Sequence, residues 1–79
     1  MEPSFAEIAA ALREAAIADR MRLTRFEETV RRMRACGQVP AFDLSDLERR
    51  LARLTAAEAW FRLLVPHEAA VRALLPGRR

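Results

Sequence analysis

The chain has 79 residues, of which 52% are hydrophobic and 32% are charged, and its formal net charge is +3. A chain of this length forms one small domain that buries roughly 60% of its unfolded surface and is marginally stable without a partner. The single cysteine, Cys36, excludes an internal disulfide framework. No secretory leader pattern opens the chain and no apolar run approaches the roughly 18 residues of a membrane span. We therefore expect a soluble cytoplasmic protein with no membrane association.

All 14 basic residues are arginine, and alanine occurs 16 times. This bias is typical of GC-rich bacterial genomes, in which arginine codons replace lysine codons. The net charge is therefore only a weak indication of nucleic-acid binding, because strong phosphate binders concentrate their basic excess on one face. Alanine, leucine, arginine and glutamate favour helices, and β-branched residues never alternate as in a strand, so the predicted fold class is all-α.

The first predicted helix covers about residues 4–36. Ser4 and Glu7 have the spacing of a capping box at its start. Gly37 supplies a stop at its end, and Pro40 prevents continuation. At 1.5 Å per residue, about 33 residues give a helix roughly 50 Å long.

The chain is predicted to form one helical domain over residues 1–79, with a loop over 37–43, a second helix over about 44–65 and a short third helix over about 66–75. Asp43 or Ser45 can cap the second helix. Pro66 is placed as the first residue of the third helix, because proline is tolerated where the backbone N–H has no helical partner. A bend at Val65 and Pro66 is therefore expected.

Apolar residues recur with coiled-coil spacing along both long helices. They are Phe5, Ala9, Leu12, Ala16, Leu23, Phe26, Val30 and Met33 on the first helix, and Leu44, Leu47, Leu51, Leu54, Phe61 and Val65 on the second. Folding the chain back about residues 38 and 39 predicts a long antiparallel hairpin in which Phe26 meets Leu51 and Asp19 meets Glu58. The sequence leaves open whether two hairpins dimerise.

Each long helix also carries a second apolar face. Ile17 and Met21 lie about 170° from the seam of the first helix, and Trp60, Leu63 and Leu64 form a second face on the second helix. One interpretation is that the third helix folds over Trp60 and Leu64 to complete a core. The other is that all five residues bind a partner protein or a second copy, with Trp60 as the energetic anchor. We favour the second, because exposed apolar stripes on small chains usually mark an interface.

Asp19 and Glu58 would form a pair of carboxylates in one layer of the predicted hairpin. A di-metal helical site needs further carboxylates and two histidines, and the chain has one histidine. Arg22 follows Asp19 by three residues and Arg62 follows Glu58 by four, so we expect local ion pairs or a break of the helices at this layer.

Cys36 and His67 are the remaining candidates for chemistry. In the hairpin they would lie about 30 Å apart at 1.5 Å per residue, which excludes a nucleophilic dyad. His67 is more simply a surface or capping residue. No phosphate-binding loop, dinucleotide fingerprint or zinc spacing occurs. The sequence therefore predicts no catalytic residue, no cofactor and no metal site, and we expect the protein not to be an enzyme.

The stretch 20–34 contains six arginines and two glutamates. Within it Arg22, Arg25 and Arg32 flank one side of the apolar seam. Arginines in such positions usually cover the seam with their methylene stems and pair with acids. Contact of these three residues with an acidic partner protein, or with DNA or RNA, stays open, although no helix-turn-helix recognition helix stands out.

The sequence thus predicts a small non-enzymatic interaction module that acts as an adaptor, a small chaperone or a regulatory subunit in a bacterial cytoplasm. In outline, such a hairpin is similar to the small helical-hairpin co-chaperones of type III secretion, and this likeness is one of shape. The alternative hypothesis is a small nucleic-acid-binding regulator, an antitoxin-like helical dimer that uses residues 20–34.

Overall fold

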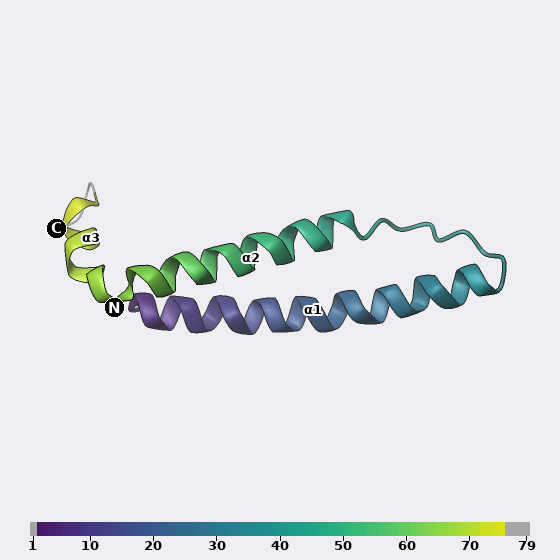
Figure 1. The fold of residues 1–79 in the computed structure, drawn as a ribbon, viewed down its shortest axis with the longest axis horizontal. Coiled ribbons are helices and arrows are strands. Elements are labelled where there is room, and N and C mark those ends of the chain that lie inside the picture. Colours follow the sequence, from purple (N-terminus) through teal and green to yellow (C-terminus); the bar gives the residue numbers. More distant parts are fainter. Residues whose placement is uncertain (1, 76–79) are drawn as a thin grey trace.

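The computed structural model describes residues 2–75, and all regular elements in that range are helical. Helix α1 comprises Phe5–Ala35 and helix α2 comprises Ser45–Leu64; they pack side by side as an antiparallel hairpin (Figure 1). A 3₁₀ turn at Val65–His67 leads directly into α3, Glu68–Leu74. The prediction of an all-α hairpin is therefore confirmed, with one long helix and one bent helix whose bend lies at the 3₁₀ turn.

Both ends of α1 are fixed by local hydrogen bonds. The hydroxyl of Ser4 accepts from the Glu7 backbone N–H at 3.1 Å and donates to the Glu7 carboxylate at 3.2 Å. At the other end Gly37 has a φ of 75°, which glycine adopts without a steric cost. The N–H groups of Gly37 and Gln38 then donate to the carbonyls of Arg34 and Met33 at 3.0 and 2.8 Å. This Schellman pattern satisfies the last carbonyls of the helix.

The register of the hairpin differs from the predicted one. Residues 38–44 form an extended segment that runs back along α1, whereas the predicted register folded the chain back about residues 38 and 39 at the helical rise per residue (Figure 1). An extended residue advances about 3.3 Å and a helical residue 1.5 Å, so seven extended residues displace α2 by about eight helical positions. Asp19 consequently pairs with Arg50, where the predicted register placed Glu58.

The core between the helices is thin. Among residues 2–75 the buried apolar side chains are Phe5, Ala9, Ala16 and Leu51. The ring of Phe5 meets Phe61 edge to face, with 5.3 Å between the centroids. Two of these four residues are alanines, so Phe5 and Leu51 are the large side chains among them.

The bend brings α3 to the N-terminus of α1. The carboxylate of Glu68 accepts a hydrogen bond from the Phe5 backbone N–H at 2.9 Å. The guanidinium of Arg72 donates to Glu68 at 2.8 Å and to the Pro3 carbonyl at 2.6 Å, and it pairs with Glu2 at 2.6 Å. It also lies 4.9 Å from the centroid of the Phe5 ring. These contacts join α3 to residues 2–5.

Candidate interaction surfaces

The side of α2 that points away from α1 carries exposed apolar residues. Trp60 is 66% exposed and Leu63 is 67% exposed. Leu63 lies about 200° around the helix from Phe61, which contacts α1. We define the outer α2 face by its two large exposed apolar residues, Trp60 and Leu63; the exposed alanines of α2, which are Ala52, Ala56 and Ala59, line a groove that is shared with Arg20 and Leu23 of α1. The bent helix does not bury this face.

Leu64 lies in a different environment from the exposed side chains of Trp60 and Leu63. It lines a groove of about 350 Å³ at the open end of the hairpin. The apolar residues that line this groove with it are Pro3, Phe5, Ile8, Phe61, Val71 and Leu75. The bent helix therefore shields Leu64 in part and leaves Trp60 exposed. The interpretation in which the third helix covers both residues thus applies to Leu64 alone.

Ile17 and Met21 lie elsewhere on the hairpin. They are 48% and 56% exposed. The contact of Phe5 with Phe61 places Trp60 level with the start of α1, so Ile17 is about 18 Å further along the axis at 1.5 Å per residue. The structure therefore does not join the five predicted residues into one surface.

Asp19 is the buried charge of the hairpin, with 1% of its surface exposed. Its Oδ1 accepts from Arg22 Nη1 at 3.0 Å. Its Oδ2 lies 2.9 Å from Arg50 Nε, as an ion pair whose direction is not that of a hydrogen bond. The predicted ion pair of Arg22 with Asp19 is present, and so is that of Arg62 with Glu58 at 2.7 Å. The expected pairing of the two carboxylates does not occur, because α2 is displaced along α1.

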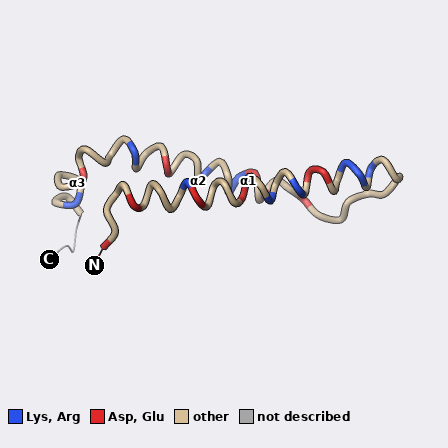
Figure 2. The backbone as a smooth tube through the Cα atoms, turned by 90° about the horizontal axis from the view of Figure 1, so that it is seen from below, with Lys and Arg blue, Asp and Glu red and all other residues tan. Residues whose placement is uncertain are grey.

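The arginines of α1 are only partly engaged. Arg22 is held by Asp19, whereas Arg25 and Arg32 are exposed and form no ion pair with any part of the chain that the structure describes. Arg25 and Arg32 lie on one face because seven residues make two turns, and Glu28 lies between them. Figure 2 shows basic and acidic residues interspersed along both helices. The positive charge is therefore interrupted by carboxylates.

Two carboxyl groups have lowered pKa values because they bind backbone N–H groups. The Ser45 backbone N–H at 2.9 Å and its hydroxyl at 2.8 Å lower the pKa of Asp43. The Phe5 backbone N–H and then Arg72 lower the pKa of Glu68. Asp43 thus accepts a hydrogen bond from the first residue of α2, and Glu68 accepts one from the first residue of α1. Both are structural carboxylates, ionised at neutral pH.

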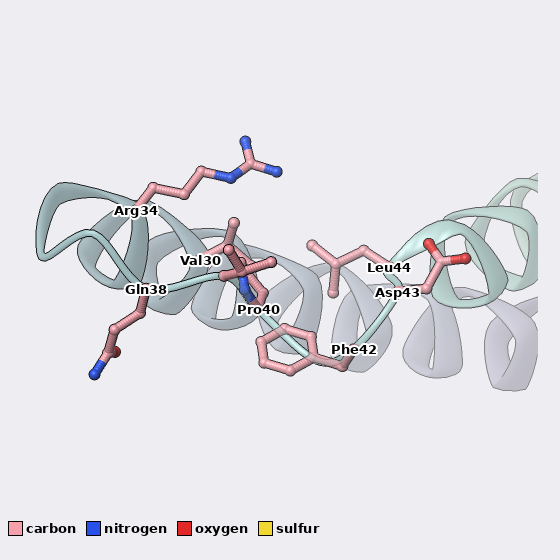
Figure 3. A pocket seen from close by; sticks show the side chains of 8 residues that line it. Val30, Arg34, Gln38, Pro40, Phe42, Asp43 and Leu44 are labelled. Atoms are coloured by element: carbon pink, nitrogen blue, oxygen red, sulfur yellow. The ribbon is translucent and has the colours of Figure 1, made fainter.

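A pocket of about 390 Å³ lies beside the connecting segment at the other end of the hairpin. Its walls include the apolar side chains of Val30, Pro40, Phe42 and Leu44 (Figure 3). The side chain of Arg34 extends away from this apolar group in the same view. Polar groups that converge on a cavity are what orient a small ligand. This pocket lacks such convergence, so it supports packing of the segment rather than a ligand site.

Cys36 and His67 are not in contact. Cys36 is exposed at the end of α1, and His67 is exposed in the 3₁₀ turn at the opposite end of the hairpin (Figure 1). No cluster of three or more potential metal ligands is present within residues 2–75. In the same range no helix has the length and apolar character needed to cross a bilayer.

Comparisons of the chain with protein-family models, with curated proteins and with solved structures find no match. The surfaces of the hairpin therefore provide the indications of its function.

Proposed function

We propose that the protein is a small non-enzymatic interaction module whose outer α2 face binds another protein chain. The exposure of Trp60 beside Leu63 carries this proposal. Tryptophan buries a large area at low entropic cost and is enriched among the residues that dominate binding energy. A partner that covers this face would remove two large apolar side chains from water.

The thin core supports the same proposal. The chain exposes 6,317 Å², whereas a globular monomer of 9.0 kDa exposes about 4,900 Å². An elongated hairpin with few large buried side chains gains little from its own packing. Association with another chain would supply the missing burial.

The module would act as an adaptor, a small chaperone or a regulatory subunit in a bacterial cytoplasm. In this proposal α3 serves as a short third helix that is tied to the N-terminus of α1 by Glu68 and Arg72. It closes the groove around Leu64 and leaves Trp60 free for the partner. Ile17 and Met21 would form a second, separate contact on α1.

Site-specific photo-crosslinking in cells tests the proposal. A photoreactive residue replaces Leu63 on the outer α2 face, and the same residue replaces exposed Thr24 on α1 as the matched control. We expect protein adducts at position 63 that exceed those at position 24 and that fall when Trp60→Ala is added. Equal labelling at both positions would contradict the proposal.

Unpaired Arg25 and Arg32 support a second candidate, a nucleic-acid-binding regulator. Binding to random duplex DNA separates the two candidates, because phosphate contacts release counterions and weaken steeply with salt. If Arg25 and Arg32 contact phosphates, Arg25→Gln with Arg32→Gln should reduce the slope of log affinity against log salt by about 2. Apolar docking on Trp60 would show no such dependence.

A further inference from the structure

We infer that α3 is a hinged strap, which the side chains of Glu68 and Arg72 hold against residues 2–5 and whose release opens the apolar groove around Leu64. The strap acts at the end of α2 and needs no partner on the outer α2 face, so it goes beyond the proposed function. Three properties of α3 support a strap, which are its polar contacts, its exposure and the turn that precedes it.

Two side chains of α3 form the latch, by which we mean the contacts of Glu68 and Arg72 with residues 2–5. Glu68 accepts from the Phe5 backbone N–H at 2.9 Å, and this N–H has no partner within α1 itself. Arg72 donates to the Pro3 carbonyl and pairs with Glu2, both at 2.6 Å. It also donates to Glu68 at 2.8 Å, so Arg72 supports both halves of the latch. These bonds involve charged groups, which makes them stronger than neutral hydrogen bonds.

The helix that the latch holds is short and poorly packed. No residue of Glu68–Leu74 is buried, and Leu74 is 82% exposed. α3 has 7 residues, whereas isolated helices of fewer than about 12–15 residues are marginal in water. α3 therefore depends on the latch for its order. Segments with few buried apolar contacts are those that open locally while the rest of a protein stays folded.

The turn before α3 has the properties of a hinge. Val65 and Glu68 have helical angles, with φ and ψ of −50° and −49° and of −53° and −47°, whereas His67 between them has −113° and 13°. A stretch of 3₁₀ helix within a longer helix often marks a hinge. Pro66 has no N–H and its ring hinders a straight continuation of α2. Opening therefore separates α3 from residues 2–5 without straightening the bend.

The strap forms one wall of the groove of about 350 Å³. Val71 and Arg72 line the groove from α3, and Phe5, Phe61 and Leu64 line it from the hairpin. Phe5 is 5% exposed, and the guanidinium of Arg72 lies 4.9 Å from the centroid of its ring. Release of α3 removes this cover and widens the groove on the same side. The latch thereby controls how accessible the apolar end of the hairpin is.

Hydrogen exchange of the purified full chain tests the latch. Arg72→Ala removes it without lowering helix propensity. Arg62→Ala is the matched control, because Arg62 pairs with Glu58 on α2 at the same spacing as Arg72 with Glu68. We expect the amides of α3 and of Phe5 to exchange at least about tenfold faster in Arg72→Ala than in the wild type, while the middle of α2 keeps its protection. Equal exchange of α3 in Arg72→Ala and Arg62→Ala would overturn the inference.

Binding of the apolar dye anilinonaphthalene sulfonate tests the opening of the groove. Arg72→Ala should raise the dye fluorescence above that of the wild type and of Arg62→Ala, which carries the same net charge. Glu68→Gln keeps an acceptor for the Phe5 N–H and should give an intermediate value. Faster exchange without added dye binding would overturn the role of α3 as a cover, and loss of the whole hairpin in Arg72→Ala would overturn local opening. Adducts at position 63 decide the proposed function separately in each case.

Discussion

The two ends of the hairpin are held by different kinds of contact. At the end where the chain termini meet, Glu68 and Arg72 bind residues more than 60 positions away in the sequence, around the buried ring of Phe5. At the loop end the polar contacts join near neighbours, and the rings of Phe26 and Phe42 pack at 5.7 Å while both stay exposed. Contacts between residues distant in the sequence are therefore concentrated where α3 meets residues 2–5.

The largest expected difference in the free energy of unfolding is between two variants that each remove one aromatic ring, one at each end of the hairpin. Phe5→Ala should lower the free energy of unfolding by about 3–5 kcal/mol, because it leaves a cavity beside Phe61 and removes the ring below Arg72. Phe42→Ala should cost about 1 kcal/mol, because the ring is already partly in water. Urea denaturation at one fixed protein concentration measures both. Similar costs would show that the two ends are equally ordered.

A smaller effect is expected at Asp19, between the two ends. Truncating both Arg22 and Arg50 to alanine leaves a buried carboxylate without a counter-charge and should cost about 3 kcal/mol. Adding Asp19→Leu to this double variant should restore most of the stability, because the buried position then needs no counter-charge. Chemical denaturation of the double and triple variants checks this. If the triple variant stays as unstable as the double variant, the arginine stems contribute by packing instead.

The elements that could be predicted from the sequence depend on short-range signals. Ser4 and Gly37 end α1 through hydrogen bonds that span a few residues, so their residue types are sufficient. The ion pairs of Asp19 with Arg22 and of Glu58 with Arg62 follow from helical spacing alone. The position of Trp60 and Leu63 off the seam follows from helical spacing, whereas the sequence left open whether the third helix covers Trp60.

The register could not be predicted, because a constant heptad spacing fits several registers equally well. The conformation of residues 38–44 selects one of them, and no local motif specifies that this segment is extended. The pairing of Asp19 with Arg50 and the separation of Ile17 from Trp60 depend on that choice. The Glu68 contact with Phe5 also escaped prediction, because its partners are 63 positions apart and no spacing rule connects them.

The smallest expected change in stability comes from neutralising the carboxylate of Glu68, by substitution or by low pH. Glu68 at the terminal end has a pKa lowered by the Phe5 backbone N–H and by Arg72. Because its folded pKa lies below the unfolded value, the stabilisation is fully present above the unfolded pKa and is lost as the pH falls through the folded pKa. Glu68→Gln retains an acceptor for the Phe5 N–H and loses the charge that faces Arg72. Its unfolding temperature should therefore lie below that of the wild type at pH 7.

That difference in unfolding temperature should shrink as the pH falls below the unfolded pKa of about 4.3 and through the lower folded pKa of Glu68, where the wild-type carboxyl also becomes neutral. Circular dichroism melts from pH 3 to pH 7 measure it. Asp43→Asn is the matched change at the loop end, where Ser45 lowers the pKa of Asp43. It should give a smaller difference of the same sign, because asparagine still accepts from the Ser45 N–H, and Arg49, the cation that acts on Asp43, forms its direct ion pair with Asp46. A larger loss for Asp43→Asn would reverse the order of the two ends and place the decisive carboxylate at the start of α2.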